Sequence, residues 1–451
     1  MRALALVLLV PLAGASLKAQ QRPGPAAKPA PAGCKFQLEH TGGLGTQSIV
    51  GADTNYYAGG GVVLVCADSS ARISSDSVAL YGRGANTLVQ FIGSVRYVDS
   101  VTVQTADRGT YYRSGDRWEA RGRVHTENQK DHSTIDGPSL DYFRSLPGVR
   151  DTLELYAIGR PTIRSFTTDS SGKQGEPYVI VADRVRMKGN DRTWAAGKVQ
   201  IDRSDFAAQS DSLFLDSGAG NEGVLVGSPL MKGLGKDSFQ LTGTRIHLDL
   251  EHQEVSYVKA LGNGHAVSAQ LDLVGDTIGL DLNRQKLVQT IAWGDSIRPH
   301  GLTTDYEIKG DSVAFDTPEQ QLREVRSFRD AWVGGKVDSL TRERDWMSGD
   351  SVVASFVTSD SAGVPRNTLG TLEARGKAHS YYRLANKKSP QGLPSIDYTR
   401  GDRITVLMKT GALRGVDQVQ IHGDVDGVHI EPAPVAPDTT TAAPSRARDA
   451  R

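Results

Sequence analysis

Two short signatures alternate through most of this 451-residue chain and restrict what it can fold into. One signature begins with a glycine. The other is an Asp-Ser phrase such as GDSVAFD at 310–316, which falls mostly 14 to 17 residues after such a glycine. Steps of 29 to 47 residues leave room in each unit for two or three strands with their turns. The first signature is Gly, one variable residue and usually Val, Pro or Ala, beginning at Gly60, Gly93, Gly122, Gly159, Gly197, Gly227, Gly262, Gly335, Gly376 and Gly423, with a degenerate copy at Gly294.

Apolar and polar residues alternate behind each Asp, which indicates strands with one buried face. Helical periodicity is almost absent, and Leu322, Val325 and Phe328 are expected on a strand as well. Stacked units would bury their apolar faces in one interior, so the sequence predicts an elongated all-β fold of two facing sheets. With about eleven units and strands ~4.8 Å apart, the body would run roughly 50 to 60 Å. The expected inner face includes Val185, Met187, Leu213, Leu215, Ile246, Leu248, Ile278, Leu280, Val313 and Phe315.

The ends of the chain differ from the repeats in composition. Residues 1–19 combine Arg2, an apolar run and a small residue at Ala19, which is typical of a secretory signal peptide. The Pro/Ala-rich linker at 20–33 and the tail at 432–451 lack the apolar residues needed to order a chain, so both are expected to be disordered. The folded part is then 34–431, in an exported protein.

Charge and cysteine content narrow the function classes. The chain has 52 basic and 52 acidic residues, and this balance gives no indication of a nucleic-acid partner. The two cysteines, Cys34 and Cys66, predict one disulfide in an oxidising compartment such as the periplasm. Two lone cysteines and ten scattered histidines do not make a metal site, and no cofactor motif is present.

Catalysis is the least favoured reading of the Gly-Asp-Ser phrase. A serine hydrolase would need Ser312 on a strand-to-helix turn, and the Asp249-x-x-His252 spacing would supply the other triad members. The phrase also occurs at 294 and 349 in equivalent surroundings, whereas a nucleophile is normally unique. Gly permits positive φ and Asp can bond nearby amides, so the phrase predicts a recurring corner in a protein that is not an enzyme.

Two other residue sets admit both a binding and a structural interpretation. Basic residues recur at the Gly-x-Val step and would form either a ladder for phosphates or a solvated edge that discourages aggregation: Arg123, Arg160, Lys198, Lys336 and Lys377. The dispersed tryptophans would either stack on sugars or cap repeat units, and packing is favoured for Trp118, Trp194, Trp293, Trp332 and Trp346.

The order of these signatures resembles the OstA-like family, which includes the periplasmic lipopolysaccharide-transport protein A and the N-terminal domain of the outer-membrane lipopolysaccharide-assembly protein D. Residues 196–199, AGKV, followed by residues 210–216, SDSLFLD, are the closest copy, and 181–185 and 371–376 also fit. The resemblance implies an elongated V-shaped β-jellyroll whose apolar groove holds acyl chains and whose edge strands join related proteins. The ten inner-face residues would then line the groove.

The resemblance therefore implies a periplasmic protein that carries lipopolysaccharide or a similar amphiphile toward the outer membrane. Its expected partners are other jellyroll transport proteins and an outer-membrane assembly protein, joined through exposed strands near residues 50 and 430. The alternative is a structural β-solenoid scaffold or spacer with a filled interior and no ligand. Bulky inner residues such as Met187, Phe315 and Met408 could fill such an interior.

Overall fold

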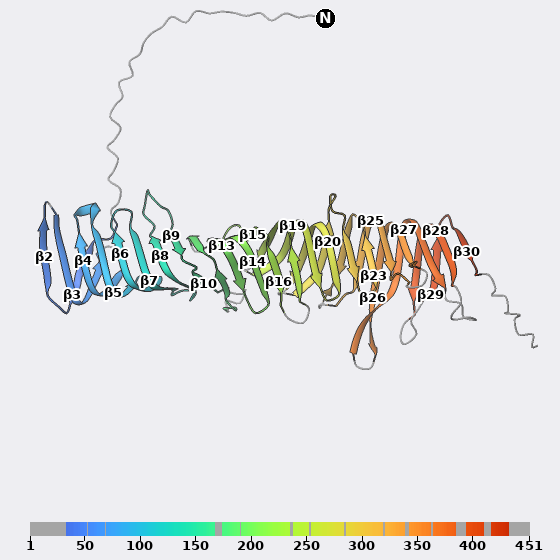
Figure 1. Cartoon of the computed structure of the whole chain (residues 1–451), viewed down its shortest axis with the longest axis horizontal. Helices are drawn as coiled ribbons and strands as arrows, with labels where there is room; N and C mark the ends of the chain where they lie inside the picture. Colours follow the sequence, from blue (N-terminus) through green and yellow to red (C-terminus); the bar gives the residue numbers. More distant parts are fainter. Residues whose placement is uncertain are drawn as a thin grey trace, which may run out of the picture.

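The computed structural model describes residues 33–432, apart from 52, 68, 167–173, 190, 235–237, 252–253, 284–285, 319–320, 339–341, 362–363, 385–393 and 410–415. The signal peptide at 1–19, almost all of the linker at 20–33 and almost all of the tail at 432–451 lie outside these residues. The described chain is all-β, as the alternation predicts, and forms one long narrow body with β2 at one end and β30 at the other (Figure 1). No helix in the described part is long and apolar enough to cross a lipid bilayer.

The elements follow one another as short hairpins. In the first half they are β1 (Phe36–Thr41), β2 (Gly45–Val50), β3 (Asp53–Cys66), β4 (Arg72–Tyr81), the 3-10 turn η1 (Gly84–Asn86), β5 (Leu88–Val98), β6 (Thr102–Tyr112), β7 (Arg117–Asn128), β8 (Thr134–Phe143), β9 (Glu154–Ile158), β10 (Thr162–Ser165), β11 (Tyr178–Val181), β12 (Arg184–Lys188), β13 (Arg192–Asp202), β14 (Phe206–Asp216) and β15 (Glu222–Val226). In the second half they are β16 (Leu230–Gly233), β17 (Phe239–Thr242), β18 (Arg245–Glu251), β19 (Glu254–Ser268), β20 (Leu271–Asn283), β21 (Lys286–Trp293), β22 (His300–Thr303), β23 (Tyr306–Lys309), β24 (Ser312–Asp316), β25 (Glu324–Gly335), β26 (Trp346–Ser361), β27 (Val364–Leu384), β28 (Ser395–Met408), β29 (Val416–His422) and β30 (Asp426–Ile430).

Each long strand belongs to two layers, because its pairing register shifts in the middle. In β13 the residues before Ala196 pair with β12 and the end of β14, whereas those after Val199 pair with β11 and the start of β14. The same break occurs in β3, β5, β7, β19, β25 and β27. We call the layer that runs from β2 to β29 the first layer and the layer that runs from β1 to β30 the second layer.

The Gly-x-Val signature marks the crossing between the layers. Gly197 has a φ of 81° and Lys198 a φ of 47°, and equivalent pairs of positive φ begin at Gly93, Gly122, Gly159, Gly227, Gly262 and Gly376. A Cβ on Gly197 would lie 2.5 Å from Oδ2 of Asp183, and one on Gly227 would lie 2.3 Å from that of Asp211. Glycine is needed there because positive φ and this close approach both exclude a side chain.

Several crossing glycines contact the Asp of the preceding strand. Gly93 meets Asp76 and Gly122 meets Asp107, a pairing that the sequence spacing did not specify. Gly335 carries the Gly-x-Val signature but does not lie at a crossing. In β25 the register shifts between Phe328 and Ala331, where Arg329 and Asp330 have φ values of 57° and 49°. In β25, Arg329 and Asp330 therefore take the positive-φ positions that Gly and its follower occupy at the Gly-x-Val crossings.

The crossings define one edge of the folded body, the corner edge, and the hairpin turns define the opposite one, the turn edge. Each unit contributes two strands to each layer, so about eleven units at ~4.8 Å per strand extend roughly 100 Å, about twice the predicted length. Alternate residues of both layers face the interior between them. The body twists, so the η1 turn lies along its upper side in Figure 1 while the β26–β27 hairpin projects from its lower side.

Candidate functional site

The ten predicted groove residues all lie on the first layer and face the interior. Eight are at most 5% exposed, including Ile246, Ile278 and Val313, which have no exposed surface at all. The Phe315 ring reaches the second layer, where a Cβ on Gly301 would lie 3.2 Å from it. Only Met187 and Leu215 are partly exposed. Most of the predicted groove is therefore a packed seam near the corner edge.

A second set of apolar side chains lies closer to the turn edge, and of these the sequence interpretation placed only Met187 and Leu215 in the groove. These residues are partly exposed and pack against the buried core. We call them the rim row: Tyr178, Met187, Leu215, Phe239, Leu250, Leu271, Leu282, Leu287, Tyr306, Phe356, Leu369, Tyr382, Met408 and Val416. The signal for them was the third apolar residue of a run, such as Leu250 after Ile246 and Leu248, or Leu282 after Ile278 and Leu280.

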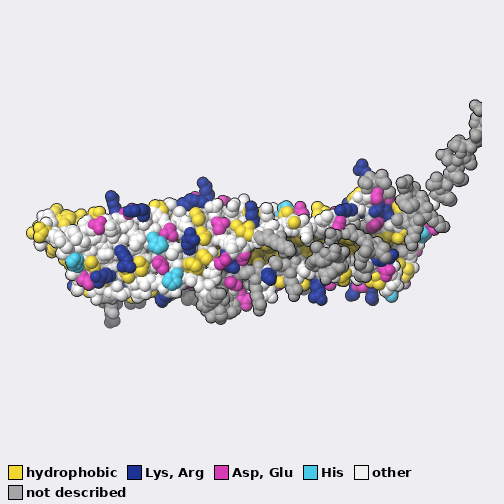
Figure 2. Space-filling view, turned by 90° about the horizontal axis from the view of Figure 1, so that it is seen from below, with side chains coloured by type: hydrophobic (Ala, Val, Ile, Leu, Met, Phe, Trp, Pro, Cys, Tyr) yellow, Lys and Arg dark blue, Asp and Glu magenta, His cyan; other side chains and the backbone are white. Residues whose placement is uncertain are grey.

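The rim row belongs to both layers. Leu250, Leu282 and Phe356 are at the turn ends of first-layer strands, and Phe239 and Tyr306 are at those of second-layer strands. Figure 2 shows hydrophobic side chains along a furrow in the half of the molecule that carries the C-terminal strands. The row thus offers a long apolar surface that is accessible from one side and backed by the packed seam.

The rim tyrosines place hydroxyl groups next to this apolar surface. Burial raises the pKa values of Tyr178, Tyr306 and Tyr382. The Tyr178 hydroxyl accepts a hydrogen bond from Arg203 at 2.6 Å. Tyrosine combines an apolar ring with a polar end, which suits a boundary between hydrocarbon and water.

The serine considered for catalysis does not lie at the turn that a hydrolase nucleophile needs. Ser312 begins β24, a strand in the middle of the first layer, and not a strand-to-helix turn. The Asp311 amide donates to the carbonyl oxygens of Phe328 and Arg329, as expected of a corner. His252 lies outside the described residues. Within the described part, no group of three or more His, Cys, Asp or Glu side chains could hold a metal ion.

The basic residues of the Gly-x-Val step are partly neutralised. Arg123 Nη2 lies 2.6 Å from Asp107 Oδ1, and Arg160 Nη1 lies 3.4 Å from Asp183 Oδ1. Hydrogen bonding to Arg123 lowers the pKa of Asp107. Lys336 lies beyond the crossing and pairs with Asp305 at 3.0 Å. These ion pairs join neighbouring strands. They also neutralise positive charge that a ladder for phosphates would need.

The tryptophans do not share one platform. Trp118 is buried in the interior, and Trp194 and Trp293 lie on the first layer beneath Arg186 and Lys259. Two more lie on the second layer: Trp332 beneath Lys309, and Trp346 stacked on Tyr381 with 6.3 Å between ring centroids. Four of the five therefore pack as cation–π or stacking pairs on separate surfaces.

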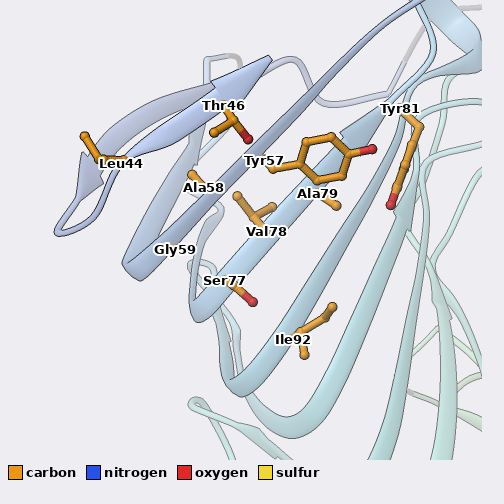
Figure 3. Close-up of a pocket in the computed structure, with 10 residues that line it drawn as sticks. All are labelled: Leu44, Thr46, Tyr57, Ala58, Gly59, Ser77, Val78, Ala79, Tyr81 and Ile92. Atoms are coloured by element: carbon orange, nitrogen blue, oxygen red, sulfur yellow. The ribbon is translucent and has the colours of Figure 1, made fainter. Parts of the chain in front are cut away.

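Both ends of the body present strands with one free side. Among the described residues, β2 pairs only with β3 and β30 pairs only with β28. Val62 on β3, in contrast, is buried and lies between β1 and β4, so this part of β3 is not at an edge. Figure 3 shows a pocket beside β2, where Tyr57 and Tyr81 meet edge to face and Leu44 and Ile92 add apolar surface.

No protein-family model matches this chain, and no curated protein matches it.

Proposed function

We propose that this protein is an exported, periplasmic binding and bridging protein with an OstA-like V-shaped jellyroll fold. It would carry lipopolysaccharide or a similar amphiphile toward the outer membrane. The acyl chains would lie on the rim row, and the head group would remain in water beyond the turn edge. The protein would need no cofactor, because transfer along such a surface requires no covalent step.

The observation that carries this proposal is the rim row itself. Its side chains are partly exposed and continue along two facing layers, and contiguous apolar surface of this kind favours a binding site more than singly scattered residues do. Burial of each CH₂ of an acyl chain contributes roughly 0.8 kcal/mol. A chain of about a dozen CH₂ groups would gain about 10 kcal/mol before the cost of ordering it.

The free strands at the two ends supply the proposed bridging function. β2 is exposed throughout, and Ile49 and Val50 on it are 72% and 61% exposed. At the other end, Val428 and Ile430 of β30 are 56% and 54% exposed. Addition of a partner strand would satisfy the free backbone groups. Related jellyroll transport proteins or an outer-membrane assembly protein would dock there and set the direction of transfer.

The test is retention of lipid by the full-length protein. The protein is expressed in a Gram-negative host, purified from the periplasm and analysed by mass spectrometry for lipid A. We expect lipid A to co-purify with the wild type and to be lost from the Leu282→Glu and Phe356→Glu variants, because a charge on the rim row opposes acyl chains. Val357, next to Phe356 on β26 and 42% exposed, provides the matched control Val357→Glu.

A scaffold with a filled interior is the second candidate, favoured by the contact between Phe315 and Gly301 across the layers. The same experiment decides between them. Wild-type protein that carries no lipid, and binds none when lipopolysaccharide is added, would support the scaffold and end the transport proposal.

A further inference from the structure

The interior of the N-terminal third is filled by aromatic side chains that cross between the layers. Phe36 of the second layer lies 4.8 Å from Tyr111 and 6.2 Å from Phe91 of the first, between ring centroids. Tyr97 of the second layer lies 5.7 Å from Trp118 and 6.4 Å from Tyr142. We call these six aromatic residues the stopper: Phe36, Phe91, Tyr97, Tyr111, Trp118 and Tyr142. Among the described residues, every aromatic pair that joins the two layers belongs to it.

Hydrogen bonds fix the stopper in place. The Trp118 indole N–H donates to the side-chain oxygen of Gln104, and the Gln104 amide donates to Thr126 at 2.7 Å. The Tyr111 hydroxyl donates to Asp116 at 2.7 Å. Gln104, Thr126 and Asp116 are all less than 8% exposed. Buried polar groups that are satisfied in this way favour one packing of the rings.

Residues 33–35, which precede β1, cross the turn edge over the stopper. We call this segment the strap. The Cys34–Cys66 disulfide, with 5.5 Å between Cα atoms, anchors the strap to the second layer. The Gly33 amide donates to the carbonyl oxygen of Arg113, which belongs to a first-layer turn. A Cβ on Gly33 would lie 2.5 Å from the Tyr111 hydroxyl, so the strap lies directly on the stopper.

A second bridge lies beside the strap. Arg144, which follows first-layer strand β8, donates to the hydroxyl of Ser69 in a second-layer turn at 3.4 Å. Its Nε lies 4.0 Å from Asp116 Oδ2. Burial raises the pKa of Tyr142 to about 12, and it also raises the pKa values of Tyr97 and Tyr111. Tyr97 and Tyr111 are buried, and Tyr142 is partly buried.

We infer that the amphiphile site is blind at its N-terminal end: the stopper and its strap block the interior at β5 to β8, so cargo on the rim row cannot reach the β2 end through the interior. This inference rests on the proposed function. It makes the two ends of the protein unequal. Cargo would enter and leave along the turn edge or at the β28–β30 end, while the β2 end would serve for attachment alone.

The test uses tryptophan fluorescence with 9,10-dibromostearic acid as the acyl-chain probe, because bromine quenches an indole only at close range. One full-length reporter keeps Trp118 and carries Phe at residues 194, 293, 332 and 346. A second reporter also carries Trp118→Phe and Phe356→Trp. We expect the probe to quench most of the fluorescence of the second reporter and almost none of that of the first.

The outcomes separate the two proposals. Equal quenching of both reporters would overturn the blind end and leave the amphiphile site standing. Quenching of neither would overturn the proposed function and the blind end with it. Adding Cys34→Ser and Cys66→Ser to the Trp118 reporter should increase its quenching several-fold. If the circular dichroism spectrum of that variant is unchanged and Trp118 stays shielded, the strap has no part in the closure.

Discussion

Residues 36–142 and residues 178–416 are built from the same hairpins and crossings, yet their interiors differ. In the first region, large rings from both layers meet in the middle and a disulfide-anchored strap covers the turn edge. In the second, the packed seam contains aliphatic or small residues such as Leu248, Leu280 and Ala354, and the rim row beside it stays partly exposed. One backbone plan therefore yields a packed core or an open surface, depending on the volume of its inward side chains.

We expect the largest difference in stability between the two regions when a ring of the stopper is removed. Trp118→Ala would leave a cavity in a packed interior and should lower the free energy of unfolding by about 3–5 kcal/mol. Leu282→Ala, on the partly exposed rim row, should cost less than about 2 kcal/mol, because less apolar area is lost. Urea unfolding monitored by circular dichroism measures both. Equal costs would show that the two interiors are packed alike.

Removal of the strap anchor comes next. The disulfide joins residues 32 apart, so replacing Cys34 and Cys66 with Ser should cost roughly 3 to 4 kcal/mol in the chain-entropy model. Hydrogen exchange should rise in β3 to β7 and stay unchanged in β19 to β28. Wild-type protein in reducing buffer is the control and should behave like the double variant. A uniform rise along the chain would mean that the regions do not open separately.

The sequence predicted the elements of both regions but not the contrast between them. Period-two alternation correctly assigned strands and inward faces, as at Val313 and Phe315, because those patterns are local. The pairing of each corner Asp with the next glycine depends on register between strands, which the spacing alone left ambiguous. The length was underestimated because a unit adds two strands to each layer and not one.

The stopper, and the rim row apart from Met187 and Leu215, escaped prediction for a different reason. The aromatic residues of the stopper occupy ordinary inward positions, and only the facing layer determines that Tyr97 meets Trp118. The rim row is set by how far each strand extends beyond the seam, as at Leu250 and Leu282. Both depend on contacts between residues distant in sequence. A corner of Arg329 and Asp330 likewise carries no glycine signal.

Both regions contain crossings with a positive-φ glycine, and we expect a smaller effect from substitutions there. Gly122→Ala in the closed region and Gly376→Ala in the open one should each cost about 1–3 kcal/mol, because both residues have positive φ. A Cβ would also lie 2.5 Å from Asp107 Oδ2 or 2.2 Å from Asp350 Oδ2. Gly115 also has a φ of 81°, but a Cβ there would meet no atom within 4 Å. Gly115→Ala therefore measures the cost of the positive φ alone. Unequal losses at Gly122 and Gly376 would extend the difference between the regions to the corner edge.

The smallest expected effect is a response of the open region to acid. Glu307 on β23 accepts a hydrogen bond from Lys309 Nζ, 2.6 Å away, and contacts Arg344. Burial raises its pKa, but these hydrogen bonds and charges outweigh burial and lower the pKa to about 2. The stabilisation is complete above the ordinary glutamate pKa near 4.5 and is lost as the pH falls from there toward 2.

Glu307→Gln separates this group from the other carboxylates. We expect its melting temperature to lie below that of the wild type at pH 6 and the two curves to converge as the pH approaches 2.5. Hydrogen exchange of the wild type should rise in β22 and β23 before it rises in the stopper strands β5 to β7, because Glu307 contacts two basic side chains, whereas the Asp107–Arg123 pair between β6 and β7 lies at the exposed corner edge. Simultaneous loss of protection in both regions would mean that acid unfolds one cooperative unit. Closed and open regions would then share a single stability despite their different interiors.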